Sequence, residues 1–209
     1  MDKDFALRHR NLETLLRAAV ALDLPLPYRP LSTGRPAAVM MLCGLRENGS
    51  FEVLITRRSN TLETHRGQYA LPGGMRDAES ETPERNALRE TREEVGIPED
   101  GVIAIGALPE LWTPTGFTVT PVVGLLRSPI EEVEIRPSPD EIDLWFWCSV
   151  DRFRATGVYS TEPRTFVHEG KSRTVPMDVY QVDEHRIWGA TGAMLRNFIS
   201  RLEKVESSR

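Results

Sequence analysis

Three glutamates stand close together in the middle of the chain, at Glu90, Glu93 and Glu94. In a helix, Glu94 lies four residues after Glu90 and Glu93 lies three after it, so one face carries all three carboxylates. If that face is partly buried, two such charges ~4 Å apart repel by roughly 4 kcal/mol at an effective dielectric of 20. A hard divalent cation reverses this repulsion, because Mg²⁺ and Mn²⁺ take carboxylate oxygens, carbonyl oxygens and water as ligands. The spacing therefore predicts a divalent-metal site.

The alternative is an ordinary solvated helix face. Glutamate and arginine are good helix formers, and Arg89 and Glu93 have the spacing of an i, i+4 ion pair. The surroundings favour the metal, because Pro72-Gly73-Gly74 predicts a turn that lets backbone come close to the helix. A carbonyl of Gly73 or Gly74 could then complete the metal's shell.

The helix that positions these carboxylates is marked at both ends. Thr82 can cap its start, Pro83 suits the first helical position, and Glu84 faces the positive end of the helix dipole. Gly96 follows the last turn, where glycine ends many helices. We therefore expect a helix over residues 83–95.

This segment resembles the Nudix box, the signature of hydrolases that cleave a diphosphate linked to another moiety. The family pattern is Gly, five residues, Glu, seven residues, then Arg-Glu-U-x-Glu-Glu-x-Gly-U, where U is bulky and apolar. The residues that match are Glu81, Arg89, Glu90, Glu93, Glu94, Gly96 and Ile97. Two departures are Thr91 at an apolar position and six residues, not five, between Gly74 and Glu81.

The resemblance implies a role for each matching position. Glu90 and Glu94 become the main metal ligands, Glu93 a further ligand, and Gly74 the source of a coordinating carbonyl. Glu81 either anchors Arg89 or binds the metal through water. The implied cofactor is Mg²⁺ or Mn²⁺.

The same resemblance implies a mechanism in which metal ions neutralise the diphosphate and a glutamate takes a proton from water. Arg89 orients the carboxylates. The general base is either a box glutamate, Glu90 or Glu93, or a glutamate on a distant loop. Glu141 is the candidate on the acidic loop before the strand expected at 144–149, and its neighbour Asp140 is a second one.

Residues upstream of the box resemble the coenzyme A diphosphatase subgroup of Nudix hydrolases. The similar stretches are Leu54-Ile55-Thr56-Arg57-Arg58-Ser59, the set Leu62, His65 and Gly67, Leu71-Pro72-Gly73-Gly74, residues 113–121 and residues 187–191. The subgroup also carries the extra residue before the box helix. Two positions depart from it, because Glu63 replaces an arginine and Leu71 replaces a phenylalanine.

Coenzyme A is strongly anionic, so basic residues should meet its 3′-phosphate and diphosphate. The candidates are Arg57, Arg58, His65, Arg66 and Arg76. Each arginine could instead be a surface residue, and His65 could be structural. The expected reaction converts coenzyme A or acyl-CoA to 3′,5′-ADP and phosphopantetheine or its acyl form. The alternatives are hydrolysis of ADP-ribose, NADH or another dinucleotide, and a Nudix-like nucleotide-binding module without catalysis, against which the intact glutamates argue.

The elements around the box helix form a mixed α/β pattern. Strands are expected at 37–45, 51–57, 68–72, 102–108, 118–126 and 144–149, a late hairpin at 157–168 and 174–182, and a last helix at 189–203. The resemblance implies an α/β (α+β) Nudix fold, an α/β/α sandwich with a mixed sheet, plus an N-terminal helix. We assign residues 36–205 to the hydrolase domain and residues 1–35 to a helix over 4–22 with a proline-rich linker.

Composition excludes several functions. A formal net charge of −5 over 209 residues argues against nucleic-acid binding, and no apolar run is long enough to cross a membrane. Two cysteines in apolar runs form no disulfide framework, so we expect the reducing cytoplasm. The apolar stripe of the first helix could pack on its own domain or on a second subunit, which makes a homodimer possible.

Overall fold

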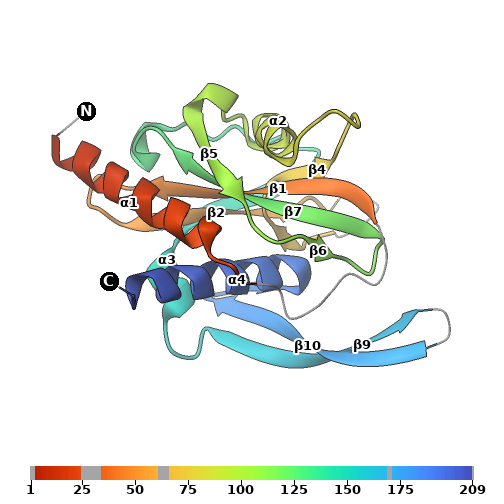
Figure 1. The fold of residues 1–209 in the computed structure, drawn as a ribbon. Coiled ribbons are helices and arrows are strands. Elements are labelled where there is room, and N and C mark those ends of the chain that lie inside the picture. The colour runs from red at the N-terminus through yellow and green to blue at the C-terminus, as the bar shows by residue number, and fades with distance from the viewer. Residues whose placement is uncertain (1–2, 25–33, 61–65, 169–170, 209) are drawn as a thin grey trace.

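The computed structural model describes residues 3–24, 34–60, 66–168 and 171–208. Within them, helices cover both faces of a large mixed sheet, and a smaller sheet lies beyond the C-terminal helix (Figure 1). The helices are α1 (Lys3–Ala21), α2 (Pro83–Val95), α3 (Val150–Arg154) and α4 (Gly189–Glu206), with 3₁₀ turns η1 (Glu99–Gly101) and η2 (Ile130–Glu132). This confirms the expected α/β/α architecture.

Among the described residues, eight strands form the large sheet and three form the small one. The large sheet contains β1 (Arg35–Leu45), β2 (Phe51–Arg58), β3 (Tyr69–Ala70), β4 (Gly73–Met75), β5 (Val102–Ala107), β6 (Leu111–Trp112), β7 (Phe117–Leu126) and β8 (Ile142–Ser149). The small sheet contains β9 (Tyr159–His168), β10 (Lys171–Val182) and β11 (His185–Trp188). The predicted strands and late hairpin are confirmed, whereas β4, β6, β11 and α3 were not predicted.

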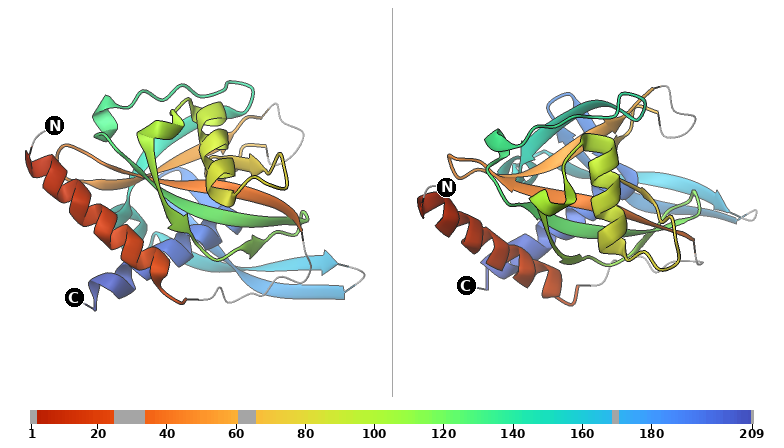
Figure 2. Two further views of the ribbon diagram at one scale, coloured as in Figure 1. Left: turned by 45° about the horizontal axis from the view of Figure 1, so that its top comes forward. Right: turned by 90° about the horizontal axis from the view of Figure 1, so that it is seen from above.

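Strand β1 organises the large sheet. It runs parallel to β7 along one side, while on the other side it pairs antiparallel with β2 at its end and with β4 at its start. Seen from above, α2 lies over β1 and β7 (Figure 2). Strands β2 and β4 pair with different parts of the same edge of β1, and β4 contacts α2.

The turn predicted at Pro72-Gly73-Gly74 is wrong for the two glycines, which belong to strand β4 and pair with Val39 and Ala38 of β1. A Cβ atom at Gly73 would lie 2.4 Å from the Ala38 carbonyl oxygen. Gly73 is therefore required by close backbone approach within the sheet, which a sequence pattern does not distinguish from a turn.

Helix α2 has the ends that the sequence predicts. The Thr82 side chain accepts a hydrogen bond from the Arg85 backbone N–H at 3.3 Å. Gly96 is left-handed, with φ of 75°, and its N–H donates to the Arg92 carbonyl. The buried side of α2 packs on β1 and β7 through Ala87 and Val95.

The helix expected at 4–22 is confirmed as α1, and it packs against α4 of its own chain (Figure 1). Arg201 of α4 is buried, with 1% of its surface exposed. Its guanidinium donates hydrogen bonds to carbonyl oxygens at the end of α1 and just beyond it, including Ala19 at 3.1 Å and Leu22 at 2.7 Å. The proline-rich linker lies mostly outside the described residues. None of the described helices has the length and apolarity that a bilayer crossing requires.

Candidate active site

Three residues of α2, each four positions after the last, lie against the backbone of β4. The Glu94 carboxylate accepts a hydrogen bond from the Gly73 N–H at 3.0 Å. The Glu90 carboxylate lies over Gly74, where an added Cβ atom would stand 2.5 Å from Oε2. One turn earlier, the Asn86 amide donates to the Met75 carbonyl at 3.1 Å. The helix period therefore stacks two carboxylates and an amide against three consecutive residues of β4.

Arg89 joins the remaining carboxylates of the box. Its guanidinium donates to Glu81 at 3.0 Å, Glu90 at 2.9 Å and Glu93 at 3.0 Å. A further N–H binds the Met75 carbonyl at 3.0 Å, so Arg89 also ties α2 to β4. The hydrogen bond from Arg89 holds the pKa of Glu81 below its usual range. Glu93 stands at the exposed rim, where Arg92 also donates to it.

Burial sets the electrostatics of the two inner glutamates. Glu94 is 4% exposed, and loss of hydration raises its pKa to about 8 despite the Gly73 N–H and the nearby Arg58 guanidinium. Burial also raises the pKa of Glu90, although Arg89 opposes the shift. A buried and a half-buried carboxylate, both with a raised pKa, favour a further positive partner, because burial penalises the anion.

The acidic loop brings Glu141 to this place. Its backbone fastens to the end of α2, where Arg136 N–H donates to the Val95 carbonyl at 2.9 Å and Ser138 N–H to the Glu94 carbonyl at 2.8 Å. The Glu141 carbonyl in turn accepts from Ser59 N–H at 2.7 Å. The charge of Glu141 contributes to the raised pKa values of both Glu90 and Glu94, so its carboxylate is within electrostatic reach of both box glutamates.

The structure separates the two neighbouring arginines of β2. Arg58 approaches Glu94, with Nη1 3.7 Å from Oε1, and its Nε is buried with no hydrogen-bond partner among the described residues. Arg57 instead binds Asp143 at 2.7 Å. Successive strand residues point to opposite faces, and the register of β2 against β8 shifts between Arg57 and Arg58. Of this pair, therefore, only Arg58 approaches a carboxylate of the box helix.

The other basic candidates are scattered. Arg76 follows β4 near Glu81, whose pKa its charge helps to lower, and it lines a pocket at the start of α2. Arg66 is exposed ahead of β3. His65 and Glu63 lie outside the described residues.

The donor set fits a hard divalent cation, although the described residues hold no ready-made cluster of three His, Cys, Asp or Glu side chains that could bind an ion. Glu90 and Glu94 are engaged by Arg89 and by the Gly73 N–H as they stand. Carboxylates on adjacent turns beside glycine backbone are nonetheless the oxygen ligands that Mg²⁺ and Mn²⁺ prefer. The absence of a side chain at Gly74 leaves the space that the Glu90 carboxylate fills.

Sequence reasoning missed Asn86 and the structural use of the Gly73 N–H. The available signal for Asn86 was its spacing, because it precedes Glu90 by four residues as Glu90 precedes Glu94. A donor on the backbone of β4 leaves no trace in residue types.

Comparison with known proteins decides the family. The model of the NUDIX domain matches residues 34–169, which include β4, α2 and the acidic loop. The chain belongs to the Nudix hydrolase family. A relative from Pectobacterium atrosepticum, named as the uncharacterized Nudix hydrolase NudL, is 36% identical over 177 residues that cover 83% of this chain and 86% of the relative. A protein of the same name from Klebsiella pneumoniae is 35% identical, covering 90% of this chain and 93% of its own length.

Solved structures agree with this Nudix fold. A MutT protein from Methanosarcina mazei superposes with a TM-score of 0.51 at 19% identity, covering 85% of this chain and 99% of that protein. At this identity the likeness concerns the fold alone. As a Nudix hydrolase, the chain acts on nucleoside diphosphate derivatives.

Proposed function

We propose that this Nudix hydrolase cleaves the diphosphate of coenzyme A or acyl-CoA with Mg²⁺ or Mn²⁺. The products are 3′,5′-ADP and phosphopantetheine or its acyl form. The observation that carries the chemistry is the placement of Glu90 and Glu94 on one face of α2, with Arg58 3.7 Å from Glu94 and with Glu141 within electrostatic reach of both glutamates. The likeness of residues 54–59 and 71–74 to the coenzyme A diphosphatase subgroup supports the substrate.

In this proposal the metal is held by Glu90, Glu94 and the Gly74 carbonyl, with Glu93 and Glu81 as further or water-mediated ligands. The bound ion supplies charge neutralisation for the diphosphate and acidifies a water molecule. Arg58 binds a phosphate oxygen, for which its buried Nε still offers a donor. Arg89 keeps the carboxylates oriented through its hydrogen bonds to Glu81, Glu90 and Glu93.

We assign the general base to Glu141 in preference to Glu93. Arg89 and Arg92 donate to the two oxygens of the Glu93 carboxylate, so both of its oxygens are already engaged. Glu141 lies on a loop fastened to α2, within electrostatic reach of both inner glutamates. A carboxylate at that point can take the proton of a water molecule that attacks the diphosphate.

The test is a substrate panel with Mg²⁺ and with Mn²⁺, with the products identified by mass spectrometry. The panel contains coenzyme A, its form without the 3′-phosphate, ADP-ribose and NADH. Preferred release of 3′,5′-ADP from coenzyme A supports the proposal. Faster turnover of ADP-ribose or NADH would replace coenzyme A as the substrate, and equal rates with and without the 3′-phosphate would remove a dedicated contact to that group.

Glu94→Gln tests the metal chemistry with the same panel. We expect kcat to fall by about a hundredfold or more, because several kcal/mol of charge stabilisation depend on the ion. Glu84→Gln, in the first turn of the same helix, is the matched control and keeps its rate. Full activity of Glu94→Gln on every diphosphate would refute this role of Glu94.

A further inference from the structure

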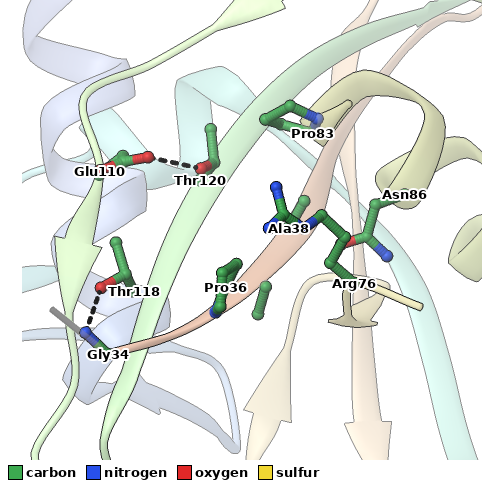
Figure 3. Close-up of a pocket in the computed structure, with 10 residues that line it drawn as sticks. Gly34, Pro36, Ala38, Arg76, Pro83, Asn86, Glu110, Thr118 and Thr120 are labelled. Atoms are coloured by element: carbon green, nitrogen blue, oxygen red, sulfur yellow. Dashed lines mark hydrogen bonds between the residues drawn. The ribbon is translucent and has the colours of Figure 1, made fainter. Parts of the chain in front are cut away.

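A pocket of about 360 Å³ lies under the N-terminal end of α2, over strands β1 and β7 (Figure 3). Its size falls within the range of small-molecule sites. Pro36, Ala38 and Pro83 give it apolar walls. None of these residues belongs to the carboxylate site described above.

Asn86 gives this pocket an unanswered hydrogen-bond acceptor. The residue is 1% exposed, and its amide nitrogen is used by the Met75 carbonyl. Its Oδ1 atom is buried with no partner among the described residues. A buried acceptor left unpaired is destabilising, and a donor on a ligand in the pocket would relieve this penalty. Asn86 lies beside Arg76 on one side of the pocket in Figure 3.

The opposite side adds a second acceptor. Thr120 donates its hydroxyl to Glu110 at 3.3 Å, and both line the pocket. A carboxylate and an amide oxygen together select a ligand that carries N–H or O–H donors. None of the ten described residues that line the pocket is aromatic, so a nucleobase would find no stacking platform. An aliphatic ligand with amide groups fits this lining better.

The pocket is also close to the reaction site along α2. Asn86 precedes Glu90 by four residues, which corresponds to about 6 Å of helix rise. Arg76 connects the two regions, because it lines the pocket while its charge lowers the pKa of Glu81. A substrate whose diphosphate meets Glu90 and Glu94 can therefore extend an organic arm toward Asn86.

We infer that this pocket binds the aliphatic, amide-bearing arm of the diphosphate substrate, which in coenzyme A is the pantetheine arm. The inference rests on the proposed function for the identity of that arm. Amide N–H groups of the arm donate to Asn86 and Glu110, and its methyl groups pack on the apolar walls.

Pro36→Trp tests the inference by filling the pocket. Pro36 is exposed and shares its strand face with Ala38, whereas the exposed Arg35 points to the opposite face, so Arg35→Trp is the matched control. We expect Pro36→Trp to raise the KM for coenzyme A by about tenfold or more, which corresponds to ~1.4 kcal/mol of binding. Arg35→Trp should leave the KM within about twofold, since the pocket stays open.

Binding of pantetheine alone gives a readout independent of turnover. In saturation-transfer NMR, pantetheine should bind the unmodified chain and Arg35→Trp, and binding should be lost in Pro36→Trp. Asn86→Leu should weaken it as well, and its melting curve shows whether the variant folds. Pro36→Trp keeps the Asn86–Met75 hydrogen bond, so the test stands even if Asn86→Leu does not fold.

Unchanged pantetheine binding in Pro36→Trp would overturn the inference. It would also be overturned if Pro36→Trp lost the binding of adenosine and kept the binding of pantetheine. The two proposals fail separately. If coenzyme A is hydrolysed and both tryptophan variants share one KM, only the pocket inference is wrong. If another diphosphate is the substrate, the proposed function fails, while pantetheine binding still decides what the pocket accepts.

Discussion

Glu90 and Glu94 occupy one face of α2, yet different groups hold them. Glu90 is bound by the guanidinium of Arg89, and Glu94 by a backbone N–H and the more distant Arg58. The neutral N–H offsets the cost of burying a carboxylate less than a guanidinium would. The burial of Glu94 is therefore less fully compensated than that of Glu90. Of these two residues, Glu94 should therefore respond more strongly to a bound cation.

Gly74→Ala should weaken metal binding with little loss of stability. The added Cβ would stand 2.5 Å from the Glu90 carboxylate, which can swing away because it ends a flexible side chain. We expect the apparent Mg²⁺ affinity to fall by about tenfold while the melting temperature stays nearly constant. Gly101→Ala is the control, because its Cβ would meet nothing nearer than 3.9 Å. Equal Mg²⁺ titrations for the two variants would contradict the role of Gly74.

The pKa of Glu94 predicts a pH-dependent stability in the metal-free chain. Burial raises this pKa from 4.5 to about 8, so the folded chain holds the proton more tightly than the unfolded chain. The stabilisation of the folded chain by protonated Glu94 is therefore fully present below pH 4.5 and is lost as the pH rises toward and through 8. Relative to the native chain, Glu94→Gln should gain on the order of a few kcal/mol across this window, at ~1.4 kcal/mol per pKa unit.

Urea unfolding with a chelator at pH 5 and pH 8.5 measures that difference. Glu84→Gln should follow the native chain at both pH values. A constant gap between Glu94→Gln and the native chain would show that Glu94 ionises freely when folded.

Local spacing made the box predictable at this scale. The caps and the i, i+4 spacing of the carboxylates depend only on neighbours within one helix. The cap at Thr82 and the shared helix face of Glu90 and Glu94 could therefore be predicted from the sequence. Arg57 and Arg58 could not be told apart, because strand alternation and an irregular register decide which one meets Glu94. The unpaired acceptor of Asn86 depends on packing against β4 and was equally invisible.

Among the elements, the acidic loop owes its position to α2. Its backbone N–H groups satisfy carbonyls that the end of a helix leaves free, and this fixes Glu141 beside the box. The sequence marks the loop by its prolines and acids, but the contact joins residues far apart along the chain.

Ser138→Pro should lower kcat, because proline removes the N–H that donates to the Glu94 carbonyl. We expect a fall of about tenfold, since small displacements of a positioned catalytic group are costly. Ser138→Ala keeps the N–H and should retain the rate. A steady-state comparison at saturating substrate separates the two, and equal kcat values would release Glu141 from the proposed role.

Arg201→Ala should destabilise the fold by about 3–5 kcal/mol, because several carbonyls at the end of α1 lose a buried donor. Chemical denaturation measures the loss, and limited proteolysis should show early cleavage within α1. Arg17→Ala is the control, since its exposed ion pair with Glu13 contributes at most about 1 kcal/mol. A midpoint like that of Arg17→Ala would mean that α1 docks without the guanidinium.

In the whole molecule, α1 completes the larger hydrophobic core through Phe5, Leu12, Leu16 and Ala19. The apolar stripe of α1 thus packs on its own domain, which is one of the two possibilities that the sequence left open. We still propose the division into residues 1–35 and 36–205, and a homodimer remains a prediction that some other surface would have to form.

Deleting residues 1–24 should expose that core face. We expect a lower melting temperature and concentration-dependent self-association, because a large apolar surface would meet water. Sedimentation velocity of the full and shortened chains measures this. A shortened chain that remains monomeric with an unchanged melting curve would show that α1 is dispensable for the fold.

The bond between Arg201 and Ala19 spans 182 positions of the sequence. During synthesis, the first helix is complete long before its partner exists. At a synthesis rate of about 5–20 residues per second, roughly 10–35 seconds pass between the synthesis of the α1 carbonyls and that of Arg201. Until then its apolar stripe has no α4 to cover it. Helix α1 leaves the ribosome well before α4 and cannot reach its final packing until α4 has followed, and a chain terminated before α4 would present an uncovered α1 to chaperones and proteases.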